Sequence, residues 1–127
     1  MIRNEVKIDT KEVFHVITPF EPHLSANLTD KLSDLMHELL EKPIKNVVLN
    51  AENVESMEEA SADRLAELSQ AFQAQNASFV ICCLQTGPRR QLEARALNIT
   101  PTESEAWDIV QMEEIERELF GNETENE

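Results

Sequence analysis

Glycine is scarce in this sequence of 127 residues, where Gly87 and Gly121 are the only two. Glycine-rich loops that hold phosphates, of the dinucleotide-binding and P-loop kinds, need several glycines within a few residues. The sequence therefore argues against a nucleotide-binding enzyme, and we expect no cofactor. Aromatic residues make up only 5% of the chain, tyrosine is absent, and the net charge is −14. Few bases could stack on such a surface and phosphate backbones would be repelled, so we expect no nucleic acid partner.

Long apolar runs are also absent. No stretch approaches the roughly 18 apolar residues of a membrane span, and the N-terminus, MIRNEVKIDT, lacks the apolar core of a secretory signal. We therefore expect a cytoplasmic protein that does not insert into a membrane. The only cysteines, Cys82 and Cys83, are adjacent. Neighbours on a strand point to opposite faces, which favours free buried thiols over a redox pair.

Motifs for catalysis are missing as well. The histidines, His15, His23 and His37, have none of the spacings that place two ligands on one metal, and no G-x-S-x-G nucleophile motif occurs. We predict that the protein is not an enzyme. One dense acidic group stands out, consisting of Glu52, Glu55, Glu58, Glu59 and Asp63. Such carboxylates could hold Mg²⁺ or Ca²⁺, but carboxylates at the start of a helix are also stabilised by its positive end. We favour the second interpretation and expect no metal.

Apolar residues, 41% of the chain, recur in patterns that alternate between strand and helix. Strands are predicted at 2–8 and 12–18, paired as a hairpin, at 45–51 and 79–84, and marginally near Ile99. Helices are predicted at 25–41, from Glu59 through Phe72, and from Pro88 to Leu97. A last helix should follow the T-x-x-E capping box of Thr102 and Glu105. Its residues Trp107, Val110, Ile115 and Leu119 are expected to face the core.

This alternation predicts an α/β fold with a mixed sheet of four to five strands flanked by about four helices. Leu49, Val80 and Ile81 should lie in its core. We expect one domain over residues 1–120 and an acidic, disordered tail over residues 121–127. Residues 101–127 carry ten acidic residues and a single basic one, so most of the net charge lies at this end of the chain.

The segment from Val47 to Leu65, VVLNAENVESMEEASADRL, resembles the signature region of STAS domains. The family is named for sulphate transporters and anti-sigma factor antagonists. In the antagonists a buried strand of the form V-V-L-(N or D)-L is followed by a short loop, an apolar residue and then D-S-S-G-L-G at the start of a helix. Met57 takes the place of the apolar residue and Glu58 that of the first acidic residue. The other predicted elements also follow the family's order along nearly the whole chain, so the resemblance implies a STAS-like single domain.

The sequence departs from the family at the functional residues of the antagonists. In place of D-S-S-G-L-G it has E-E-A-S-A-D at residues 58–63. Glu59 thus replaces the serine that a partner kinase phosphorylates in the antagonists, which makes it a degenerate phosphosite. Ser61 lies two positions further on, and successive helical residues point about 100° apart. We therefore do not expect Ser61 to face where Glu59 faces, and we do not transfer the phosphosite to it.

The resemblance implies a non-catalytic module of bacterial signal transduction that regulates another protein by binding it and is not itself phosphorylated. Its partner would be an anti-sigma factor or serine kinase. The expected contact residues are Glu55, Met57, Glu58, Glu59, Ser61 and Asp63. The alternative is a structural subunit of an ABC transporter or of a signalling scaffold. Three questions stay open at this point. They are whether the chain forms a homodimer, whether it activates or inhibits its partner, and whether Glu59 acts as a phosphoserine mimic.

Overall fold

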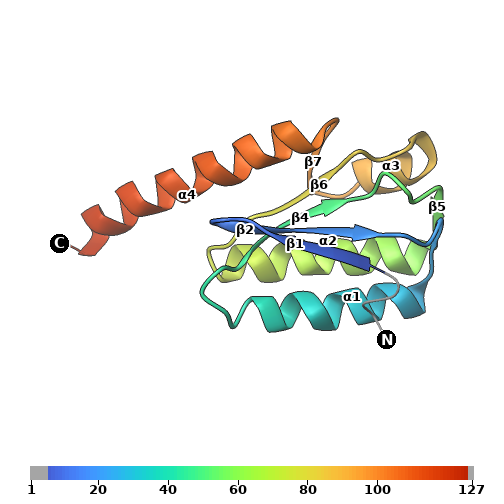
Figure 1. Ribbon diagram of the computed structural model, residues 1–127, viewed down its shortest axis with the longest axis horizontal. Coiled ribbons are helices and arrows are strands. Elements are labelled where there is room, and N and C mark those ends of the chain that lie inside the picture. The colour runs from blue at the N-terminus through green and yellow to red at the C-terminus, as the bar shows by residue number, and fades with distance from the viewer. Residues whose placement is uncertain (1–5, 126–127) are drawn as a thin grey trace.

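The computed structural model describes residues 6–125, in which strands and helices alternate along the chain (Figure 1). The strands are β1 (Val6–Thr10), β2 (Phe14–Pro19), β3 (His23–Leu24), β4 (Asn46–Asn50), β5 (Ser56–Met57), β6 (Phe79–Cys82) and β7 (Asn98–Thr100). The helices are α1 (Ala26–Leu39), α2 (Glu59–Ala74), α3 (Thr86–Glu93) and α4 (Glu103–Glu125). The predicted α/β class is confirmed.

Five strands form the main sheet in the order β1-β2-β4-β6-β7. β1 pairs with β2 antiparallel, and every other neighbouring pair is parallel, so the sheet is mixed as predicted. β4 and β6 lie at its centre, and all their residues are buried. This explains why β6 and the middle of β4 are apolar in the sequence. Leu49, Val80 and Ile81 are at most 1% exposed, which confirms their predicted place in the core.

Helices cover both faces of the sheet. α1 and α2 pack side by side on one face, and α4 crosses the other (Figure 1). The larger core lies under α1 and α2 and includes Leu32, Leu65 and Phe72. The smaller core lies under α4, where Val110 is buried and the ring of Trp107 meets that of Phe14 edge-on, with 5.4 Å between the ring centroids. The sheet therefore separates two hydrophobic layers.

The N-terminal hairpin is present, but its turn lies later in the chain than we predicted. β1 continues to Thr10, which pairs with His15, so the turn is made by residues 11–13 rather than 9–11. A hydrogen bond of 2.9 Å between Thr10 Oγ1 and His15 Nδ1 accompanies this last pair. Residues 2–5 of the predicted first strand lie outside the described residues.

The starts of α1 and α4 follow the capping signals. The hydroxyl of Ser25 accepts from the backbone N–H of Leu28 at 3.1 Å and starts α1. The hydroxyl of Thr102 likewise accepts from the backbone N–H of Glu105 at 3.2 Å, before the first turn of α4. Pro88 lies within the first turn of α3, which begins at Thr86, two residues earlier than predicted, and ends well before Leu97.

Both cysteines are free, but only Cys82 is fully buried. Burial raises the pKa of its thiol well above the ordinary value, so Cys82 stays protonated and unreactive. β6 ends at Cys82, two residues before the predicted end of the strand. Cys83 turns into the left-handed region with φ of 63° and is half-buried.

The predicted orientation of α4 is wrong for its C-terminal half. Val110 is buried and Trp107 half-buried, but Ile115 and Leu119 are more than half exposed. Ile115 and Leu119 follow Val110 by five and nine residues, which at about 100° per residue turns them away from the face that Val110 buries. The last turns of α4 also extend past the ends of the strands (Figure 1). The helix also continues through Glu125, although we expected a disordered tail from Gly121 onward. Residues 126–127 lie outside the described residues.

Candidate partner-binding site

The predicted contact residues lie where β5 leads into α2. β5 pairs in parallel with β3, and the backbone N–H of Glu58 donates to the carbonyl of Leu24 at 3.1 Å. This pairing holds the chain extended up to Glu58, which is the N-cap of α2 and has no side-chain capping hydrogen bond. The helix therefore starts at Glu59, and the acidic residues fall on its first turns.

Two of the six predicted contact residues point into the protein. Met57 is buried in the larger core. Ser61 is fully buried, and its hydroxyl donates to the carbonyl of Leu24 at 2.9 Å. Both side chains hold the junction of β5 and α2 in place, and neither is presented to a partner on the surface of this structure.

The other four predicted residues are acidic and exposed. They are Glu55, Glu58, Glu59 and Asp63. Glu58 lies beside His23, with 3.6 Å between its Oε2 and the ring Nε2. The other ring nitrogen of His23 contacts the hydroxyl of Ser56 at 2.7 Å. Glu59 and Asp63 are one helical turn apart and converge on a single cation.

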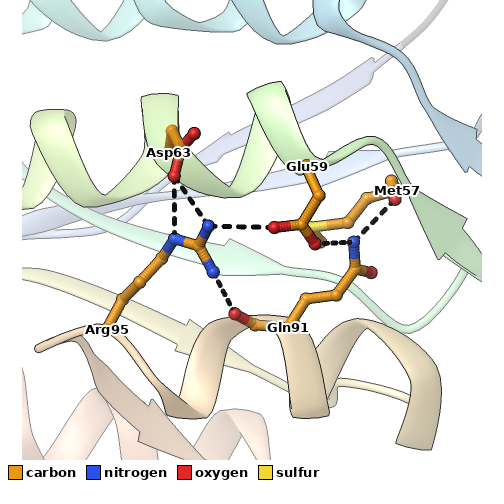
Figure 2. A network of polar contacts seen from close by, with 5 residues as sticks. All are labelled: Met57, Glu59, Asp63, Gln91 and Arg95. Atoms are coloured by element: carbon orange, nitrogen blue, oxygen red, sulfur yellow. Dashed lines mark hydrogen bonds and ion pairs between the residues drawn. The ribbon is translucent and has the colours of Figure 1, made fainter.

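That cation is Arg95, which follows the end of α3 (Figure 2). Its guanidinium donates to Asp63 Oδ1 at 2.6 Å and to Glu59 Oε2 at 3.2 Å. It also donates to the carbonyl of Gln91, while the Gln91 side-chain amide donates to Glu59 Oε1 at 3.0 Å and to the Met57 carbonyl at 2.9 Å. Side-chain exposure is 20% for Arg95 and 71% for Glu59. The network therefore ties α3 to the start of α2 and leaves the carboxylates facing solvent.

The same network fixes the charge at position 59. The hydrogen bond from Gln91, followed by the one from Arg95, lowers the pKa of Glu59 below its ordinary value. Glu59 is therefore a carboxylate throughout the physiological range. Because the pKa of Glu59 is lower in the folded than in the unfolded state, its contacts stabilise the folded state at pH values above the unfolded-state pKa. This stabilisation is lost as the pH falls through the folded-state pKa. The effect on stability is small because the carboxylate is exposed.

Sequence reasoning did not find Arg95 or Gln91. They are separated from Glu59 and Asp63 by at least 28 residues, and only the fold brings them together. The one local signal is their spacing of four residues within the helix predicted from Pro88 to Leu97, where this spacing would place both side chains on one face. That spacing does not say which acidic residues they meet.

The acidic group does not form a metal centre in this structure. Among residues 6–125, no three His, Cys, Asp or Glu side chains are placed to hold a metal ion. No helix in this part of the chain is long and apolar enough to cross a membrane.

Comparisons with known proteins agree with this architecture. A search of curated proteins found no match. Among solved structures, a protein from Thermotoga maritima described as a candidate anti-sigma factor antagonist is 18% identical with a TM-score of 0.74, over 84% of this chain and 94% of that one. A serine-to-glutamate form of RsbS from Moorella thermoacetica is 17% identical with a TM-score of 0.69, over 84% and 94%. The antagonist SpoIIAA in its unphosphorylated form is 14% identical with a TM-score of 0.66, over 84% and 97%.

Identities this low establish a shared fold alone. The family is established by the sequence itself, because the family model of the STAS domain matches residues 5–106, which is most of the chain. That range includes all five strands of the main sheet, the first three helices and the β5–α2 junction. The chain therefore belongs to the STAS-domain family.

Proposed function

We propose that this STAS domain is a non-catalytic regulatory module that binds another protein through the β5–α2 junction, with a permanent negative charge where the antagonists have a phosphorylatable serine. The observation that carries the proposal is the placement of Glu59. It lies at the first helical position of α2, is largely exposed, and is held in one orientation by Arg95 and Gln91.

A fixed carboxylate can substitute for part of a phosphate's charge. A phosphoserine carries about −1.5 to −2 charges, so one glutamate supplies roughly half of that. Asp63 adds a second carboxylate one turn away, and Arg95 neutralises one of the two. The outer surface of the junction thus keeps a net negative charge that does not depend on phosphorylation or dephosphorylation. The similar structure of RsbS with glutamate in place of one serine is consistent with a glutamate being tolerated in this fold.

The partner that fits this surface presents basic residues. Glu55, Glu58, Glu59 and Asp63 are exposed within a short stretch of chain, and charges of one sign at an interface select the opposite sign in the partner. An anti-sigma factor or serine kinase is our candidate class. Recovery of a transporter or scaffold subunit instead would favour the structural alternative.

Replacing Glu59 with serine is expected to separate binding from stability. Affinity for the partner should change by about tenfold or more, because a charge pair or clash at the centre of an interface amounts to several kcal/mol. The melting temperature should stay within about 6 °C of the parent, because Glu59 is exposed and solvent screens its contacts. The partner is captured from native cytosol with the unmodified chain, identified by mass spectrometry, and titrated by calorimetry.

The matched control is Glu38→Ser. Glu38 is an exposed acid in the last turn of α1, at the end of that helix away from β3, which pairs with β5. This variant should bind the partner as the parent does. If Glu59→Ser and Glu58→Gln both leave the affinity unchanged at low and at high salt, the junction is not the contact surface.

We also expect no phosphate at position 59 and little or none at Ser61. The Ser61 hydroxyl is buried and already donates to the carbonyl of Leu24, so a kinase would have to unfold the start of α2 to reach it. Intact-mass analysis of the protein isolated from its own cells measures this directly. A stoichiometric phosphate mapped to Ser61 would show that the chain is switched by phosphorylation after all.

A further inference from the structure

The outer face of α4 carries a row of exposed apolar side chains. Met112, Ile115 and Leu119 are 60%, 57% and 59% exposed. Among the side chains of residues 6–119, the other exposed large apolar residues are Ile8 and Phe20, at 41% and 51%. The spacings of three and four residues place all three on one stripe of the helix, as in the seam of a coiled coil. We call these three residues the α4 stripe.

α4 does not need the α4 stripe to dock on its own sheet. Ala106 and Val110 are buried in the smaller core, and one or two turns later Glu113 and Arg117 face the same way. Glu113 accepts from the Ser78 hydroxyl, and Arg117 donates to Asn46 Oδ1 at 3.1 Å. At about 100° per residue, the α4 stripe points roughly away from all four of these side chains. The face that holds α4 in place is therefore separate from the face that is exposed.

A groove between α4 and the β1–β2 hairpin is continuous with the α4 stripe. It has a volume of about 830 Å³, and Phe14 and Trp107 form part of its wall. Ile115 lines the groove and also belongs to the α4 stripe. An apolar side chain of a helix lying along the α4 stripe would thus have a recess to enter beside Trp107.

The charges of α4 that flank the α4 stripe are acidic, and Lys11, which lines the groove, is paired with Asp9 at 3.0 Å. In a coiled-coil register with Met112 and Leu119 at a and Ile115 at d, Glu116 and Glu118 occupy the e and g positions that face a partner helix. Arg117, the single basic residue of α4, is already bonded to Glu114, Ser78 and Asn46. A second copy of this helix would place acidic residues against acidic residues, which disfavours self-association.

We propose that the α4 stripe and the adjoining groove form a docking site for a basic amphipathic helix of a partner protein. The apolar residues of that helix lie on the α4 stripe, and its lysines or arginines lie beside Glu116 and Glu118. This surface lies on the other face of the sheet from α2, and the free end of α4 lies at the end of the molecule opposite the β5–α2 junction (Figure 1). The site goes beyond the proposed function, since it could be occupied while the junction binds something else.

The test uses a fluorescein-labelled synthetic peptide of three heptads, with leucine at a and d, lysine at e and g, and alanine and glutamine elsewhere. Fluorescence anisotropy with the full chain is expected to show saturable binding. A matched peptide with glutamate at e and g should bind at least about tenfold more weakly. The double variant Ile115→Ser with Leu119→Ser should weaken binding of the lysine peptide by about tenfold or more, which corresponds to at least about 1.4 kcal/mol.

The serine variants distinguish docking from unspecific attraction to an acidic protein, because they leave the net charge unchanged. Phe20→Ser is the matched control, since Phe20 is equally exposed but lies outside α4, and it should leave peptide binding unchanged. Equal binding of the lysine peptide to the parent and to the double variant would overturn the proposal. The proposal is also overturned if sedimentation shows that the chain forms a dimer and that Ile115→Ser abolishes it, because a second copy would then cover the α4 stripe.

Discussion

Replacing Phe72 with alanine is expected to lower the free energy of unfolding by about 3 to 5 kcal/mol, the usual cost of removing a large buried aromatic side chain. Phe72 is fully buried between α2 and the sheet, and its ring stacks on that of Phe79 with 5.3 Å between the centroids. Little can move to fill the cavity, because α1 packs beside α2 on the same face. Since domains are stable by only about 5 to 15 kcal/mol, this variant should lie near the limit of folding. Urea unfolding followed by circular dichroism measures the loss.

The control removes the same atoms from a surface position. Phe20 is half exposed, so Phe20→Ala should change stability by no more than about 0.5 kcal/mol. A loss below about 1.5 kcal/mol for Phe72→Ala would mean that α2 is not packed on the sheet as described.

Replacing Ser61 with aspartate is expected to cost about 3 kcal/mol or more, because it buries a carboxylate without a cation to pair with it. The Ser61 side chain is fully buried and faces the carbonyl of Leu24, an acceptor that would repel a carboxylate. Burial and this carbonyl raise the pKa of an acid in the folded state above its unfolded value of about 3.9. The loss of stability should therefore be at its full value when the pH is above the folded-state pKa, and it should shrink as the pH falls toward the unfolded-state pKa. Urea unfolding at pH 7 and pH 5 gives the two values.

Two controls isolate the charge. Ser61→Asn has nearly the same shape as the aspartate and should keep only the steric part of the cost, with no dependence on pH in this range. Ala60→Asp adds a carboxylate one residue earlier on an exposed position, and it should change stability by no more than about 1 kcal/mol. Equal stability of Ser61→Asp and Ser61→Asn at pH 7 would contradict the buried placement of Ser61.

The parts of the fold that the sequence predicted well are those in which local pattern and burial coincide. β6 and the middle of β4, Val47–Leu49, are apolar, as expected for strands that are covered on both faces. The starts of α1 and α4 follow from the hydroxyls of Ser25 and Thr102, which act on the residues next to them in the chain. Such features need no knowledge of the rest of the molecule.

The errors had two sources. Ile115 and Leu119 continue the apolar composition of α4, but they follow Val110 by five and nine residues, and at about 100° per residue both turn away from the face that Val110 buries. The other source is a distant segment: the acidic run predicted the exposure of Glu59 and Asp63, but not the arginine that holds them. Arg95 is supplied by the segment after α3, which only the parallel order of the strands brings to the start of α2.

The order of strands in the sheet also has a consequence for how the chain folds. β4 lies between β2 and β6, and it pairs with β6 through residues such as Val48 and Val80, 32 positions apart in the chain. A chain emerging from the ribosome therefore completes β4 long before its second neighbour exists. During that interval one apolar edge of β4 has no strand beside it, and such an edge can pair with other chains. Fragments that end before Phe79 should accordingly aggregate, whereas the hairpin of β1 and β2, whose contacts are local, should form early.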